Sequence, residues 1–212
     1  MLGTRYVFKT KFKHGKIDKR KARIVVKGYR QIKDVDYSET FVPVARMNTF
    51  RFFLVISVYR GLVRIRIDLV AAFLYAPVVK DIYIETSEGW EIEEGNVLEL
   101  YKALYGLKQA GRNWYQVLKD FLTNDEGFKM CISDNCVFLK DDGKMMLLIY
   151  VDDMIISSLD PVDESDLLAR IKDKFEIGEE GKLDWYIGIA VDDLGDSIKL
   201  SQAHYVIKVV EK

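Results

Sequence analysis

The sequence has little of the chemistry that supports disulfide frameworks, zinc sites or membrane spans. Among its 212 residues it has only 2 Cys, 2 His and 3 Pro. Cys131 and Cys136, together with the distant His14 and His204, cannot build a disulfide framework or a four-ligand zinc site. Apolar runs are short, and we expect neither a membrane-spanning segment nor a signal peptide. The sequence therefore predicts a soluble globular chain in a reducing, intracellular compartment.

The composition indicates a folded protein with a sizeable core. Hydrophobic residues make up 49% of the chain and charged residues 31%, which excludes a disordered or low-complexity protein. A chain of 212 residues is long enough for one large domain or two small ones.

The net charge of -1 conceals a strong asymmetry along the chain. Residues 1–66 contain 17 Lys and Arg against 4 Asp and Glu, whereas residues 67–212 contain 15 against 29. A basic segment of this kind favours a polyanionic partner, with nucleic acid the first candidate. The alternative is a solvated surface, or a basic tail that contacts the acidic remainder.

The N-terminal segment predicts a β-hairpin with a cationic face. Apolar and basic residues alternate over residues 6–13, a second strand is expected over residues 21–29, and His14 with Gly15 forms a turn. Because Lys21 and Arg23 are two positions apart, both side chains leave the same side of the strand.

The remaining pattern predicts an α+β fold. We expect an apolar, fully buried helix over residues 49–60 with Asn48 as its N-cap and Gly61 as its terminator. Further helices are expected over residues 112–126, residues 161–175 and a last stretch capped by Ser201. Strands are expected at residues 63–68, 82–85, 135–140, 145–157, 185–191 and 197–200.

The pair Asp152-Asp153 is the most informative chemical feature. Apolar residues flank the pair on both sides, and no Lys or Arg occurs from Met145 through Asp160. Two adjacent carboxylates on an apolar hairpin repel each other unless a cation or solvent compensates them. An ordinary solvated β-turn is the alternative, since Asp is common in turns.

A third carboxylate, Asp68, ends the strand expected at residues 63–68. If this strand lies beside the hairpin of Asp152 and Asp153, the three carboxylates converge. Hard oxygen ligands suit Mg²⁺ or Mn²⁺, and such a cluster can hold two ions about 3.5–4 Å apart.

Several blocks of the sequence resemble the reverse transcriptase domain of copia-type LTR retrotransposons. The blocks occur in the order of that family and extend over nearly the whole chain. They are residues 21–31, 36–46, 67–74, 104–115, 150–153, 187–189 and 200–205.

The resemblance implies the fingers and palm of a right-hand polymerase, with the palm a ferredoxin-like antiparallel sheet backed by helices. It divides the chain into a first part of the fingers, a first part of the palm, second parts of each, and the start of a truncated thumb or connection. These segments are residues 1–45, 46–76, 77–112, 113–200 and 201–212.

The same resemblance implies the activity and the residues that carry it. The activity is RNA-directed DNA synthesis from dNTPs by two-metal phosphoryl transfer, with two Mg²⁺ or Mn²⁺ ions held by the catalytic carboxylates Asp68, Asp152 and Asp153. Phe73 matches a steric gate against the ribose 2′-hydroxyl, with a core aromatic as the alternative. The implied nucleotide-binding residues are Lys21, Arg23, Leu69, Val70, Ala71, Ala72, Phe73 and Gln109, where a surface loop amide is the alternative for Gln109. Ile187 and Gly188 match a primer grip, for which a strand kink is the alternative.

The implied partners are an RNA or DNA template with its primer, dNTPs, and a longer polyprotein that carries RNase H and integrase, without a membrane. The implied location is the cytoplasm, in virus-like particles, and also the nucleus.

Arg66 departs from the family, which has Gln there, and we expect it to pair with Asp68 and compete with metal. We also expect the chain to stop near the start of a thumb. The alternative function is therefore an inactive remnant that only binds nucleic acid.

Overall fold

The structure is a computed structural model that describes residues 1–13, 16–87, 89–93 and 95–210. The chain forms two compact units, each built from two stretches of sequence. Unit 1 comprises Met1–Val42 and Ala72–Leu118, and unit 2 comprises Pro43–Ala71 and Lys119–Lys212. With antiparallel sheets and the four helices α1 to α4 in its described residues, the chain has the mixed α+β fold that its sequence predicts.

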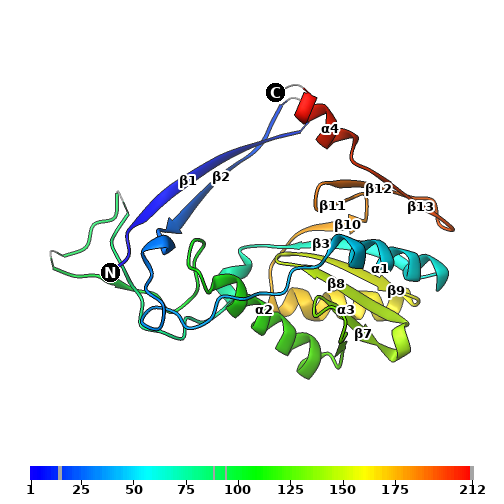
Figure 1. Ribbon diagram of the computed structural model, residues 1–212, viewed down its shortest axis with the longest axis horizontal. Helices are drawn as coiled ribbons and strands as arrows, with labels where there is room; N and C mark the ends of the chain where they lie inside the picture. The colour runs from blue at the N-terminus through cyan, green and yellow to red at the C-terminus, as the bar shows by residue number, and fades with distance from the viewer. Residues whose placement is uncertain (14–15, 88, 94, 211–212) are drawn as a thin grey trace. The chain divides into compact units, whose positions relative to one another are not determined.

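Unit 2 is built on a six-stranded antiparallel sheet with the strand order β10-β3-β9-β8-β7-β6 (Figure 1). Strand β8 is buried along almost its whole length, and strand β9 is buried after its first residue. This burial explains why both strands read as continuous apolar runs in the sequence. The strands are β3 (Val63–Leu69), β6 (Lys129–Met130), β7 (Val137–Lys140), β8 (Met145–Tyr150), β9 (Asp153–Ser158) and β10 (Ile177–Lys182).

Helix α3 (Pro161–Lys174) packs against β9, as its apolar stripe predicts. Asp160 is the N-cap, and its side chain accepts a hydrogen bond from the backbone N–H of Val162 at 2.8 Å. Proline at the first helical position fits this start, because its missing N–H would have no partner within the helix. The expected buried residues Leu167, Leu168 and Ile171 all lie in the core.

Helix α1 (Met47–Tyr59) packs against β8 but differs from the prediction in two ways. Its N-cap is Arg46, without a side-chain cap bond, so the expected N-cap Asn48 is wrong and already lies inside the helix. The helix is also not buried all round, since Phe50 is fully buried while Phe52 is 66% exposed. A helix on one face of a sheet buries one side only, which the apolar composition of the whole sequence segment obscured.

A smaller sheet completes unit 2, and it contains β11 (Trp185–Tyr186), β12 (Ile189–Asp193) and β13 (Ile198–Ser201). The guanidinium of Arg64, on β3, donates two hydrogen bonds to Asp193 of β12, at 2.7 and 2.8 Å. Arg64 is buried, so this ion pair joins the two sheets of the unit through a charge removed from water. Helix α4 (Ala203–Val210) follows. Ser201, the expected cap, is the last residue of β13 and lies two positions before the helix, and its hydroxyl accepts from the Ala203 N–H at 3.3 Å.

Unit 1 contains the predicted hairpin, formed by β1 (Thr4–Lys13) and β2 (Lys16–Val26), which pair antiparallel. The expected turn at His14 and Gly15 lies outside the described residues. A second pair of short strands, β4 (Tyr83–Ile84) and β5 (Leu98–Glu99), lies in the same unit.

Helix α2 (Ala110–Asp120) begins two residues before the predicted start and continues into a π-helical turn, η3 (Phe121–Asp125). The buried positions expected from its periodicity are confirmed for Trp114, Leu118, Phe121 and Leu122.

Two glycines of unit 1 approach each other so closely that neither tolerates a side chain. A Cβ atom on Gly28 would collide with the carbonyl oxygen of Gly106, and one on Gly106 would collide with the carbonyl oxygen of Val26. Gly106 also has a φ of +98°, a conformation that glycine adopts without strain. Backbone therefore packs directly on backbone where the end of β2 meets the loop before α2.

Strand β10 is the main element that the sequence did not predict. It is exposed along most of its length and contains Gly178 and Gly181, so it lacks the alternation that marks a half-buried strand.

Within the described residues, none of the helices is both long and apolar enough to cross a membrane.

Candidate metal centre

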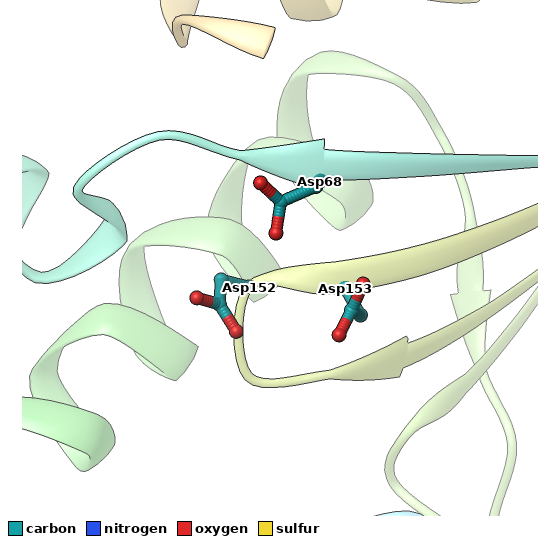
Figure 2. A group of neighbouring side chains, drawn as sticks. All are labelled: Asp68, Asp152 and Asp153. Carbon is teal, nitrogen blue, oxygen red and sulfur yellow. The ribbon is translucent and has the colours of Figure 1, made fainter. Parts of the chain in front are cut away.

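Three carboxylates from separate parts of the sequence meet at one end of the six-stranded sheet (Figure 2). Asp68 lies near the end of β3 directly opposite Asp153, the first residue of β9. Asp152 lies in the turn that precedes β9. One oxygen from each of the three carboxylates lies within 4.8 Å of the others. The predicted convergence is therefore confirmed, and it depends on strand register rather than sequence proximity.

Asp152 lies in a strained turn between β8 and β9 that a hydrogen bond ties to β3. Tyr150 pairs with Asp153, so the turn residues are Val151 and Asp152, one position earlier than the sequence predicted. Val151 has a φ of +60°, which is rare for a β-branched residue and costs about 1–3 kcal/mol. The backbone N–H of Leu69 donates to the carbonyl oxygen of Asp152 at 2.9 Å and ties the turn to β3.

The site is half-buried and strongly acidic. Burial raises the pKa of Asp68, and the neighbouring charges of Asp152 and Asp153 raise it further, while Arg66 lowers it. The surroundings therefore disfavour the ionised form of Asp68. A positive charge at the site would offset both the cost of desolvation and the repulsion from Asp152 and Asp153.

Arg66 supplies one such charge, but to a different partner from the one expected. Its Nε and Nη2 atoms both donate to Oδ1 of Asp153, at 3.0 and 2.7 Å. The prediction that Arg66 pairs with Asp68 is therefore wrong. Residues two apart on a strand share a face but point in parallel, so the guanidinium reaches diagonally across to β9 instead.

The donor set fits a hard divalent cation. All three side chains offer carboxylate oxygens, the ligands that suit Mg²⁺ and Mn²⁺. Neither free cysteine belongs to this group of ligands, and Cys136 is buried, with a pKa raised to about 12 chiefly by that burial. A soft-metal site is not indicated here.

The backbone amides expected to face a triphosphate are only partly available. The N–H of Leu69 is bonded to Asp152, and the N–H of Val70 donates to the carbonyl oxygen of Glu176 at 2.8 Å. Ala71 has a φ of +51°, and the short 3-10 helix η2 (Ala72–Tyr75) begins directly after it. The expectation for Leu69 to Phe73 therefore narrows to Ala71, Ala72 and Phe73.

Phe73 and Arg23, both predicted to bind the nucleotide, contact the same aromatic ring in unit 1. The ring of Phe73 lies 4.6 Å from the ring of Tyr105, centroid to centroid. The guanidinium of Arg23 lies over the same Tyr105 ring, 5.2 Å from its centroid. Lys21, the other predicted residue of this strand, pairs in register with Lys9. Arg23 is thus the one that shares a ring with Phe73.

Gln109 is neither exposed nor a simple loop amide, since it is only 6% exposed. Its Oε1 accepts from Nε2 of Gln31 at 3.0 Å, and its Nε2 donates to the carbonyl oxygen of Asp36 at 3.1 Å. Gln31 in turn accepts from the N–H of Lys108. The amide group of Gln109 therefore holds the loop before α2 in place.

Ile187 and Gly188 form the turn between β11 and β12, with φ values of +42° and +86°. The strand expected over residues 185–191 is therefore two strands with a tight turn, and the alternative of a simple strand kink is wrong. The role of this turn as a primer grip stays a prediction.

Sequence reasoning missed Tyr105 and Tyr186. Tyr186 is fully buried, stacks on Phe50 at 5.1 Å, and its hydroxyl has no hydrogen-bond partner among the described residues. Tyr105 lies in the block of residues 104–115 and Tyr186 in the strand expected over residues 185–191, but the sequence assigned neither tyrosine a role, and only the tertiary contacts distinguish them.

Comparison with known proteins identifies the family. The model of the family described as reverse transcriptase (RNA-dependent DNA polymerase) matches residues 1–212. The chain belongs to the reverse transcriptase family. The resemblance to copia-type retrotransposons is confirmed by similarity to Pol polyproteins of plant and yeast transposons.

These relatives are much longer than the chain. The Pol polyprotein of transposon RE1 from Arabidopsis thaliana is 33% identical over 217 aligned residues, which cover 100% of the chain and 15% of the relative. That of transposon TNT 1-94 from Nicotiana tabacum is 34% identical over 220, with 100% and 16% covered. The Gag-Pol polyprotein of transposon Ty1-H from Saccharomyces cerevisiae is 27% identical over 196, with 88% and 10% covered. The reverse transcriptase domain thus matches a small part of each polyprotein.

Proposed function

We propose that this chain is an RNA-directed DNA polymerase core that extends a primer 3′-hydroxyl with dNTPs. The observation that carries the proposal is the cluster of Asp68, Asp152 and Asp153, whose ligand oxygens lie within 4.8 Å of one another in a reverse transcriptase domain. In this proposal the palm, with a ferredoxin-like sheet, is residues 46–76 and 113–200, most of which belong to unit 2. The fingers are residues 1–45 and 77–112, most of which belong to unit 1, and residues 201–212 begin a thumb.

Asp68 and Asp152 are the main candidates to hold two Mg²⁺ or Mn²⁺ ions, with Asp153 as the third ligand. When bound, such ions activate the attacking hydroxyl and stabilise the leaving oxygen. Strand pairing fixes the position of Asp68 against Asp153, and the hydrogen bond from Leu69 fixes Asp152. The carboxylates are therefore pre-positioned by backbone contacts, as a catalytic group requires.

The reaction joins the primer 3′-oxygen to the α-phosphorus of a dNTP, with loss of the hydroxyl proton and release of pyrophosphate. Lys21 and Arg23 are the proposed cationic partners of the triphosphate, together with the backbone amides of Ala71, Ala72 and Phe73. The ring of Phe73, supported by Tyr105, is the proposed gate against a ribose 2′-hydroxyl. Gln109 contributes through the loop that it holds, and Ile187 with Gly188 is the proposed primer grip.

Nucleic acid is the proposed partner of the β1–β2 hairpin. Lys9 lies directly opposite Lys21 in the register of the two strands, so this cross-strand pair is of like charge. A hairpin that brings cationic side chains side by side favours a polyanionic partner such as nucleic acid. We further propose that the chain acts as one segment of a longer polyprotein, as the lengths of its relatives suggest.

Primer extension on an RNA template with Mg²⁺ or Mn²⁺ and dNTPs tests the proposal. Asp152→Asn is expected to abolish extension and to leave the affinity for an RNA–DNA duplex nearly unchanged. Asp142→Asn is the matched control, since Asp142 is exposed in the same unit and lies outside the cluster. Full extension by the Asp152→Asn variant would contradict the assignment of this carboxylate.

A second candidate function is nucleic-acid binding without catalysis. The contact that favours it is the ion pair between Arg66 and Asp153, which places a fixed positive charge beside the cluster. In that case the unmodified chain would bind template and primer, but it would not extend the primer with either Mg²⁺ or Mn²⁺.

A further inference from the structure

Arg66 makes an unusual contact for a residue beside a cluster of carboxylates. Two of its N–H groups converge on a single oxygen, Oδ1 of Asp153, at 2.7 and 3.0 Å. The side chains of Arg66 and Asp153 are only 21% and 23% exposed. Within the part of the chain that the structure describes, Oδ2 of Asp153 accepts no hydrogen bond. One oxygen of this carboxylate is therefore engaged and the other is open.

Strand β3 places the guanidinium at this position. Arg64, Arg66 and Asp68 alternate along the strand, so their side chains leave the same face of the sheet. Arg64 turns to Asp193 on the neighbouring sheet, whereas Arg66 lies next to the pair of Asp68 and Asp153. The two arginines therefore have separate partners, and only Arg66 acts on the cluster.

The contact changes the charge that a cation would meet. Three ionised carboxylates whose ligand oxygens lie within 4.8 Å carry three negative charges, and the guanidinium of Arg66 cancels one of them. Opposite charges a few ångströms apart in a partly buried site interact strongly, because solvent screens them only in part. The same geometry means that a cation approaching Asp153 meets a positive charge already bound to it.

We propose that Arg66 is a positioning residue that holds Asp153 and lowers the affinity of the carboxylate cluster for divalent cations. The proposal rests on the proposed function, since it takes the cluster to be a cation site. As a consequence, Asp153 contributes only its open oxygen to a cation, and Asp68 and Asp152 are the main ligands. Replacement of Arg66 by a neutral residue releases Asp153 to the cation.

Titration of the full chain with Mn²⁺ alone, without nucleic acid or nucleotide, tests the proposal. Arg66→Gln is expected to bind Mn²⁺ about tenfold more tightly than the unmodified chain, since one positive charge a few ångströms from the cation is removed. Arg66→Lys keeps the charge and is expected to remain within about threefold of the unmodified chain. Arg60→Gln is the matched control, because Arg60 is an exposed arginine of the same unit that donates to the backbone carbonyl oxygen of Asp142.

Two outcomes would overturn the proposal. One is an unchanged or weaker Mn²⁺ affinity in Arg66→Gln, and the other is an equal change in Arg66→Gln and Arg60→Gln. Urea unfolding of each variant checks that it is folded; if Arg66→Gln does not fold, Arg66→Met replaces it with the same expectation.

Asp152→Asn separates this proposal from the proposed function. If this variant loses Mn²⁺ binding while Arg66→Gln binds as the unmodified chain does, the cation site stands and only the role of Arg66 is wrong. If the unmodified chain and Arg66→Gln both fail to bind Mn²⁺, the cation site and the role of Arg66 fail together.

Discussion

The hairpin of unit 1 and the carboxylate cluster of unit 2 both bring like charges together, but they compensate them differently. In the hairpin, the exposed Lys9 lies opposite the half-buried Lys21 on partly exposed strands, where water and salt screen the repulsion. In the cluster, Asp68 lies opposite Asp153 in a half-buried site, where burial and repulsion raise the pKa of Asp68 and Arg66 neutralises part of the charge. An exposed row of charges suits an extended polyanion, whereas a half-buried cluster calls for a discrete ion. Under the proposed function, the two units therefore bind chemically distinct partners.

The largest expected effect is the loss of primer extension and Mn²⁺ binding when one carboxylate of unit 2 is neutralised, whereas neutralising a carboxylate of unit 1 should have no such effect. Asp68→Asn is expected to lower primer extension by at least about a hundredfold and to remove most Mn²⁺ binding, because a neutral amide replaces an anionic ligand. Duplex affinity, measured by fluorescence anisotropy, should change by less than about twofold. Asp18→Asn, an exposed carboxylate on β2 of unit 1, is the control and should leave Mn²⁺ affinity unchanged.

The next effect concerns the stability of unit 2. Asp193→Asn is expected to lower the free energy of unfolding by about 2 kcal/mol, because it leaves the buried guanidinium of Arg64 without its ionic partner. Asp192→Asn is the control, since Asp192 is exposed and lies 3.5 Å from an exposed lysine. Urea unfolding of both variants measures the difference, and equal values would contradict a structural role for the Arg64–Asp193 pair.

The same pair predicts a direction for the pH dependence. Hydrogen bonds from Arg64 lower the pKa of Asp193 below its usual value. The stability from a lowered carboxyl pKa is present above the pKa of the unfolded chain and is lost as the pH falls through the folded pKa. The difference in unfolding free energy between the unmodified chain and Asp193→Asn should therefore shrink below about pH 4. A difference that grows on acidification would contradict this sign.

A third, smaller effect tests the hairpin. Replacement of Lys9 and Lys19 together by alanine is expected to weaken template–primer binding about tenfold at low salt and to reduce the slope of log affinity against log salt by about 2. Replacement of Lys129 and Lys144 by alanine makes the same charge change in unit 2 and is the control. Equal losses in the two double variants would remove the distinction between the units.

The smallest expected effect concerns the ring between Arg23 and Phe73. Tyr105→Leu is expected to reduce discrimination between dNTPs and rNTPs by about three- to tenfold, because an aromatic contact worth about 0.5–1.5 kcal/mol no longer holds the ring of Phe73. Tyr101→Leu is the control, since Tyr101 is 76% exposed. The ratio of incorporation efficiencies measures the effect, and Mn²⁺ affinity should stay the same in both variants.

Much of the fold could be predicted from local pattern. The hairpin of unit 1, the stripe of α3 and the buried positions of α2 follow directly from hydrophobic period and capping residues. Strand β10 could not be predicted, because an exposed, glycine-containing edge strand forms by pairing with β3 and not by burying its own side chains. The exposed side of α1 could not be predicted either, because its sequence is apolar on nearly all sides and does not reveal which face the sheet covers.

The candidate site was predictable as a set of residues but not as a geometry. The acidic character of Asp68, Asp152 and Asp153 is visible in the sequence, whereas their meeting depends on the register that places Asp68 opposite Asp153. The partner of Arg66 depends on the same register, and the sequence alone gave the wrong carboxylate. Tyr105 lies in the block of residues 104–115, but the sequence did not predict its two contacts with Phe73 and Arg23, which depend on tertiary structure.

The contact between Gly28 and Gly106 has a consequence for how unit 1 tolerates mutation. Where side chains meet, a large residue at one position can be offset by a small one at the other. Here each added Cβ would meet a carbonyl oxygen of the main chain, which no second substitution can shorten. The two positions are therefore locked independently, and a chain that loses either glycine must move its backbone or give up the junction.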